Sequence, residues 1–145
     1  MGATGIISFV NLIVLFTGYY PGTLPPDSIW QIRQTIENIY SNHHPFAHTI
    51  VIKIALKVGM KLFGDMNKAV ALYSVCQVLF MAAVFAYVIV TLYQMKISRK
   101  WLIGCFIWYL MMPYHIMYSF TMWKDVPFGG FVAVFMVAAL RILKG

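Results

Sequence analysis

The chain has 145 residues, of which 61% are hydrophobic and 10% are charged, and its mean hydropathy is +0.78. A soluble domain carries roughly 45–50% apolar and about 25% charged residues, so a soluble globule, a disordered chain and a disulfide-rich secreted module are excluded. The formal charge of +7 lies at the ends of apolar runs, which is typical of integral membrane proteins and does not form the basic face of a nucleic-acid binder. We therefore predict an all-α integral membrane protein with no nucleic-acid partner.

The first predicted membrane span covers about residues 3–20 and ends at the pair Tyr19–Tyr20. A helix needs about 20 mostly apolar residues to cross roughly 30 Å of hydrocarbon. No basic residue precedes this run and no small-residue cleavage site follows it, which argues against a cleaved signal peptide. Because the chain begins without a flank and stops directly after an apolar run, we expect it to be the N-terminal part of a longer protein.

Residues 21–66 are predicted to form a long loop outside the membrane that contains amphipathic juxtamembrane helices. The prolines within Pro21–Pro26 prevent the first span from continuing as a helix. A short helix then begins at Asp27, and Ser28 with Gln31 fits a capping box.

A second helix starts near Pro45 and covers 46–63, with a lysine at every fourth position: Lys53, Lys57 and Lys61. Two interpretations are open. The segment spans the membrane with its lysines snorkelling, or it lies on the surface with the lysine stripe in water. The stripe itself suits either a phosphate site or an anchor to lipid headgroups. We favour the surface position because of the distribution of Lys and Arg around the later spans.

Three further spans are predicted, at about 68–94, 101–120 and 126–143, which gives about four transmembrane helices in total. If 46–63 lies on the surface, the basic cluster after the second span shares a side with the basic residues at the end of the fourth, and that side is then cytoplasmic. These residues are Lys96, Arg99, Lys100, Arg141 and Lys144. We therefore expect a multi-pass plasma-membrane protein whose loops 21–66 and 121–125 both face the extracytoplasmic side.

The four acidic residues all fall in these two outer loops, and two of them stand beside spans: Asp27 and Asp125. Local position favours a helix N-cap for each. Their convergence on one face favours a shared functional role, since ionisable groups near a bilayer are costly to keep.

Histidine and cysteine give weaker signals. His44 and His48 are four apart, a spacing that allows metal ligation from one helix face, but interface or loop histidines are the ordinary alternative. Cys76 and Cys105 lie in apolar runs without metal-type spacing and are interpreted as buried thiols that pack.

The order of these features resembles the GT-C superfamily of integral membrane glycosyltransferases. It looks closest to the bacterial protein mannosyltransferases and lipid A aminoarabinose transferases. The matching pieces are Asp27 after the first span, His44-Pro45, Leu62-Phe63-Gly64-Asp65, a span with Pro113, and Lys124-Asp125-Val126-Pro127. Ser28 stands where the family usually has Glu, and Phe46-Ala47 stands where it has Pro-Leu, so the chain resembles a divergent branch.

The resemblance implies transfer of a sugar from a polyprenyl-phosphate donor to an acceptor on the extracytoplasmic face, in cell-envelope glycan or glycolipid synthesis. It implies that Asp27 is the general base and that Asp125 completes the site, through a divalent metal or by orienting the donor. Lys124, with Lys53 and Lys57, would bind the donor phosphate, and His44 and His48 are candidate metal ligands. The alternative is a non-catalytic polytopic membrane protein, such as a fragment of a transporter or an assembly subunit, in which both acids are caps or line an ion path. Neither interpretation identifies the sugar or the acceptor.

Overall fold

The computed structural model describes residues 2–41 and 45–144, and the regular structure within these ranges is helical. The helices are α1 (Gly2–Gly18), α2 (Pro26–Glu37), α3 (Phe46–Phe63), α4 (Met66–Gln94), α5 (Arg99–Met111), α6 (Pro113–Ser119) and α7 (Asp125–Lys144). The all-α prediction is confirmed.

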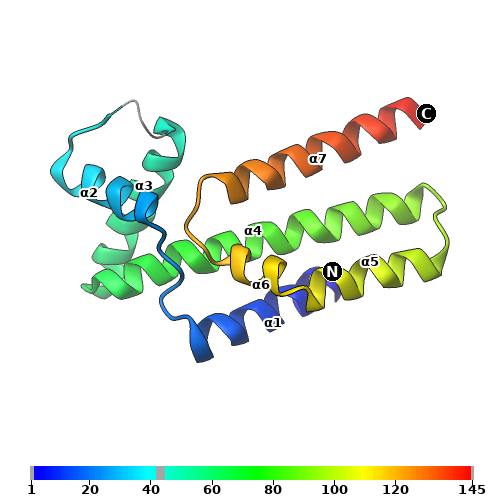
Figure 1. The fold of residues 1–145 in the computed structure, drawn as a ribbon, viewed down its shortest axis with the longest axis horizontal. Helices are drawn as coiled ribbons and strands as arrows, with labels where there is room; N and C mark the ends of the chain where they lie inside the picture. Colours follow the sequence, from blue (N-terminus) through cyan, green and yellow to red (C-terminus); the bar gives the residue numbers. More distant parts are fainter. Residues whose placement is uncertain (1, 42–44, 145) are drawn as a thin grey trace.

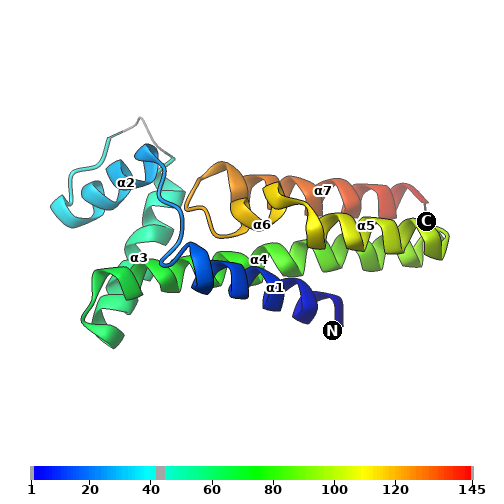
Figure 2. The same cartoon turned by 60° about the horizontal axis from the view of Figure 1, so that its bottom comes forward.

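The long helix α4 forms the centre of the molecule and packs against α1, α3, α5 and α7 (Figures 1 and 2). The helices α1, α4, α5 and α7 run roughly along one direction, and successive ones point in opposite senses. As a result, the segments 19–25 and 120–124 meet at one end of the bundle, together with α2 and α3. The turn between α4 and α5 lies at the other end.

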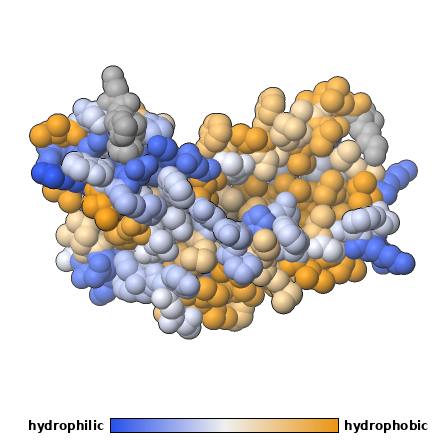
Figure 3. Space-filling model, in the orientation of Figure 1, coloured by the Kyte–Doolittle hydropathy of each residue, from blue (hydrophilic) through white to orange (hydrophobic). Residues whose placement is uncertain are grey.

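Within residues 2–41 and 45–144, two helices are long and apolar enough to cross a membrane: α4, and α7 over Asp125–Leu143. Large apolar side chains of α7 are exposed, among them Phe128, Phe131 and Phe135 at 63–70%. Figure 3 shows hydrophobic residues over the α7 side of the bundle and a more hydrophilic surface over α2 and α3. Burial in hydrocarbon would satisfy such an exposed face.

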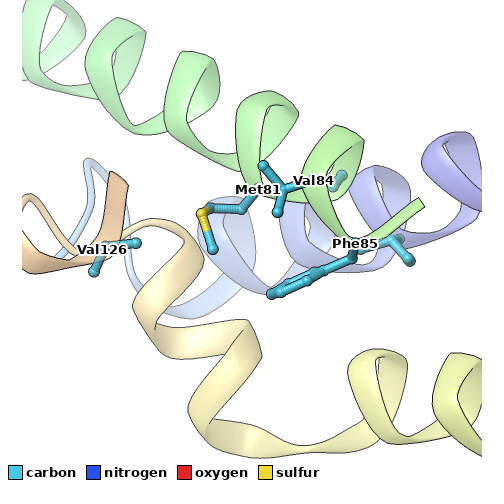
Figure 4. Close-up of a cluster of buried hydrophobic side chains, with 6 residues drawn as sticks. Met81, Val84, Phe85 and Val126 are labelled. Carbon is cyan, nitrogen blue, oxygen red and sulfur yellow. The ribbon is translucent and has the colours of Figure 1, made fainter. Parts of the chain in front are cut away.

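The buried side chains of α4 join the other helices through a series of apolar clusters. Met81, Val84 and Phe85 of α4 pack with Val126, at the start of α7, and with α1 (Figure 4). About one turn before Met81, Val78 packs with Leu15 of α1 and with Phe120. These contacts fix the 120–124 segment against α4.

The predicted third span, 101–120, is wrong as a single helix, because it breaks into α5 and α6 at Met112. Pro113 has no N–H to continue the helical ladder, and its ring disfavours helical geometry at the residue before it. Met112 accordingly adopts extended angles, φ −71° and ψ 116°. Three rings pack across the break: Phe85, Tyr109 and His115.

Helix α3 has the predicted bounds and runs across the end of α4 (Figures 1 and 2). Gly64 ends it in the left-handed conformation with φ 63°, and Asp65 caps α4 by accepting a hydrogen bond from the Lys68 amide at 2.8 Å. Gly59 lies so close to Ala69 that a Cβ on it would be 2.4 Å from the Ala69 Cα. The missing side chain is what allows α3 to cross α4 at this distance.

Helix α2 presents an unusual face to the rest of the protein. Its buried side chains are polar: Ser28, Gln31 and Thr35. Its exposed side chains include three large apolar ones: Ile29, Trp30 and Ile36. Polar groups buried in this way need hydrogen-bond partners, and α2 is therefore held by hydrogen bonds as well as by packing.

Candidate functional site

The two loops that carry the predicted acids lie side by side. Thr23 and Thr121 form an isolated bridge, and the Met122 amide donates to the Thr23 carbonyl at 3.0 Å. The buried Ser28 hydroxyl donates to the Met122 carbonyl. These contacts bring the start of α2 against the segment that leads into α7, although the two are far apart in the sequence.

This contact places Asp27 beside Lys124, with the Lys124 Nζ atom 3.6 Å from a carboxylate oxygen. Both side chains are partly exposed, at 27% for Lys124 and 45% for Asp27. Such a pair contributes little to stability, and it remains accessible to a ligand. Asp125 follows as the first residue of α7.

The local capping interpretation of Asp27 is wrong, and so is the capping box of Ser28 with Gln31. The N-cap of α2 is Pro25, which makes no side-chain hydrogen bond, and Asp27 lies inside the first turn. The Ser28 hydroxyl donates its hydrogen bond to the distant Met122 carbonyl and does not cap its own helix. The Asp27 carboxylate is thus free of a backbone role and faces Lys124.

A groove of about 900 Å³ lies beside this pair, between α3, α4 and α7. Its lining is mostly apolar, and Lys124 and Asp125 contribute to it. On the face shown in Figure 3, the surface is hollowed between the end formed by α2 and α3 and the start of α7. Cys76 is exposed and lines the groove, so the prediction of a buried thiol is wrong for this residue.

The lysine stripe of α3 is not part of the groove. The α3 residues that line the groove recur at helical spacing, from Ala47 to Val58, and the lysines are not among them. Lys53 instead donates to Asn38 Oδ1 at 2.8 Å and to the Tyr40 hydroxyl. The structure therefore does not bring Lys53 or Lys57 together with Lys124 in one phosphate site.

His48 is buried, and both of its ring nitrogens lie within hydrogen-bond distance of protein atoms. His44, its predicted partner, lies outside the described residues. In the two described ranges no three His, Cys, Asp or Glu side chains are grouped closely enough to hold a metal ion. The assignment of His44 and His48 as metal ligands therefore stays a prediction, and the reaction proposed for this site uses no metal.

One polar feature was missed from the sequence: Gln31, His48, Tyr73 and Gln77 form a continuous buried chain of hydrogen bonds. The available signal is Gln77, a polar residue in the middle of an apolar span, with Tyr73 one turn before it on the same helix face. Their partners on α2 and α3 are set by tertiary packing.

Residues 29–144 match the model of a protein family of unknown function, DUF6020. The chain belongs to this family. No curated protein and no solved structure matches the chain. The part that matches the DUF6020 model includes Lys124, Asp125 and the whole groove, whereas Asp27 lies just before it.

Proposed function

We propose that this DUF6020 chain is part of a membrane glycosyltransferase that moves a sugar from a polyprenyl-phosphate donor to an acceptor on the extracytoplasmic face of the plasma membrane. One observation carries the proposal. A carboxylate, Asp27, and a cation, Lys124, meet at 3.6 Å, and Lys124 with Asp125 borders an apolar groove. A substrate with a long apolar tail and an anionic head fits this combination.

The proposed topology has four membrane spans: α1, α4, α5 together with α6, and α7. Their alternating directions support it, because both loops with acidic residues then emerge on the same side. At the opposite end, the α4–α5 turn carries Lys96, and α5 begins with Arg99 and Lys100, which suits the cytoplasmic side. Helix α3 runs across the spans and suits a position on the membrane surface.

The donor has an apolar isoprenoid chain and an anionic phosphate, and each part fits a different part of the groove. The isoprenoid chain lies along apolar side chains such as Val51 and Phe131, where each buried methylene contributes about 0.8 kcal/mol. Its phosphate lies beside Lys124, which gives up its contact with Asp27 to bind it. Exchange of one partly exposed ion pair for another costs little.

In the proposed reaction, an acceptor hydroxyl oxygen attacks the anomeric carbon of the donor sugar. Asp27 takes the hydroxyl proton as the new glycosidic bond forms, a role that contributes typically 10²–10⁴-fold. The bond between the anomeric carbon and the phosphate oxygen breaks, and polyprenyl phosphate leaves with its charge stabilised by Lys124. Asp125 orients the donor sugar from the start of α7.

The test is Asp27→Asn in the full-length protein, assayed with a radiolabelled polyprenyl-phosphate sugar in membranes. Asn keeps the size of Asp but accepts no proton, so transfer should fall roughly 10²–10⁴-fold. Glu37→Gln is the matched control, because it makes the same acid-to-amide change at an exposed ion pair with Arg33. If Asp27→Asn retains more than about a tenth of the native activity, the loss is smaller than that expected on removal of a general base. This result would refute the role of Asp27 as the base.

A binding experiment separates the transferase from a non-catalytic membrane protein. Cys76 lines the groove, whereas Cys105 lies on α5 outside it. Polyprenyl phosphate should slow the alkylation of Cys76 and leave the alkylation of Cys105 unchanged. Equal rates at Cys76 with and without the lipid would contradict the proposed donor site and favour the non-catalytic alternative.

A further inference from the structure

A chain of hydrogen bonds crosses the interior from α2 to the segment before α7. The His48 Nδ1 atom lies 2.9 Å from the Gln31 amide oxygen, and the His48 Nε2 atom lies 2.8 Å from the Tyr73 hydroxyl. The Tyr73 hydroxyl donates to Gln77 Oε1 at 2.8 Å. All four side chains are at least 92% buried.

The chain ends on the backbone that carries the site. The Gln77 Nε2 atom lies 3.2 Å from the Tyr118 carbonyl, 3.2 Å from the Ser119 carbonyl and 2.6 Å from the Thr121 carbonyl. Three carbonyl oxygens of one short segment thus converge on a single amide group. Lys124 follows three residues after the last of them.

Carbonyl oxygens only accept hydrogen bonds, so they fix the direction of the whole chain. Gln77 must present its Nε2 hydrogens to them, and its Oε1 therefore accepts from Tyr73. Because the Tyr73 hydroxyl donates its hydrogen to Gln77, its oxygen accepts a hydrogen bond from His48. His48 therefore carries a proton on Nε2. The other ring nitrogen, His48 Nδ1, faces the Gln31 amide. Rotation of this amide about χ3 exchanges its oxygen and nitrogen, so that the amide can donate to His48 Nδ1.

We propose that His48, Tyr73 and Gln77 are positioning residues that hold segment 118–122 and thereby set the placement of Lys124 and Asp125. Segment 120–124 is not helical, and apart from the apolar contacts of Phe120 and Met122 it is held by backbone contacts with Thr23 and Ser28. A fully satisfied buried polar network makes one arrangement of a segment much more favourable than its neighbours. The effect on catalysis rests on the proposed function, but the effect on the segment does not.

The first test is amide hydrogen exchange of segment 118–125 in the full-length protein with the variant Tyr73→Phe. This change removes the oxygen that joins His48 Nε2 to Gln77 Oε1, and both atoms lose that hydrogen bond. Exchange should therefore become about tenfold faster or more, as expected for a lost buried hydrogen bond. Tyr87→Phe is the matched control on the same helix, since the described residues provide no hydrogen bond for its hydroxyl. It should leave exchange in this segment unchanged. Equal exchange in Tyr73→Phe and the native protein would overturn the inference.

Two further variants separate positioning from general damage. A Gln side chain places its amide nitrogen near the position of the His Nε2 atom, so His48→Gln should retain slow exchange. His48→Asn does not reach Tyr73 and should behave like Tyr73→Phe. Equal behaviour of the two would overturn the inference, as would exchange that accelerates throughout α4 in Tyr73→Phe.

Sugar transfer provides the catalytic readout. Tyr73→Phe should lower kcat more than it raises the donor KM, because Lys124 and Asp125 are misplaced, whereas the ring at position 73 and the other apolar residues that line the groove remain. Faster exchange with unchanged kcat would overturn the positioning role and leave the transferase intact. Absence of transfer in the native protein would refute the proposed function, whereas the exchange results would still decide the role of the chain of hydrogen bonds.

Discussion

The close crossing of α3 and α4 makes Gly59→Ala a sharp test of the fold. A Cβ at this position would lie 2.4 Å from the Cα and 2.6 Å from the Cβ of Ala69. Carbon atoms in contact prefer about 3.5–4.0 Å, so the two helices must separate by about 1 Å. The obstacle is backbone of a fully buried residue, which cannot rotate out of the way.

Overpacking of this kind costs about 1–3 kcal/mol. Replacing Gly in a helix interior returns about 1 kcal/mol through helix propensity. The net result expected for Gly59→Ala is a loss of up to about 2 kcal/mol. Gly104→Ala is the matched control, because a Cβ there meets nothing within 4 Å. It should gain stability by about 0.5–1 kcal/mol.

The assay compares the thermal unfolding of both variants in the same detergent, followed by circular dichroism. Gly59→Ala should unfold at a lower temperature than the native protein, and Gly104→Ala at the same temperature or a higher one. If Gly59→Ala is as stable as Gly104→Ala, α3 does not cross α4 at the described distance. The shape of the groove would then have to be revised.

The remaining predictions concern the two loops. Ser28→Ala should lower stability by about 1–3 kcal/mol, since it leaves a buried carbonyl without its donor; unchanged thermal unfolding would contradict the contact between the loops. Lys124→Met should change stability by less than about 1 kcal/mol, because its ion pair is partly exposed, yet abolish measurable transfer from the polyprenyl-phosphate donor; native turnover would remove Lys124 from the site. In intact cells, Ser41→Cys should react with an impermeant thiol reagent and Ser98→Cys should not, and the reverse pattern would invert the topology.

Both ends of the helix 46–63 were predicted to the residue, because residues adjacent in the sequence determine where it begins and ends. Pro45 precedes it, and Gly64 followed by Asp65 provides a left-handed stop and the cap of the next helix. The long apolar run of α4 was predictable for the same reason. Signals of this kind depend on neighbours in the sequence and need no tertiary contact.

The features that the sequence did not reveal depend on contacts between distant residues. Ser28 fits a capping box, but a carbonyl 94 positions away competes successfully for its hydroxyl. The break at Pro113 is a backbone effect that hydropathy does not register, and a proline inside a span can kink it or divide it. Cys76 lies in an apolar run, and only the placement of α3 and α7 leaves it open to a groove. The adjacency of Asp27 and Lys124 was expected only to the extent that both loops lie on one face.

The inverted faces of α2 have a mechanical consequence. Apolar surfaces tolerate small rotations and slides, but Ser28 and Gln31 hold α2 through directional bonds to Met122 and to Thr49. A shift of one residue in the register of a helix turns each side chain by about 100°, so both bonds would break in the same movement. The two bonds therefore hold α2 in one register, and Asp27, in its first turn, faces Lys124 only when the helix is docked in that register.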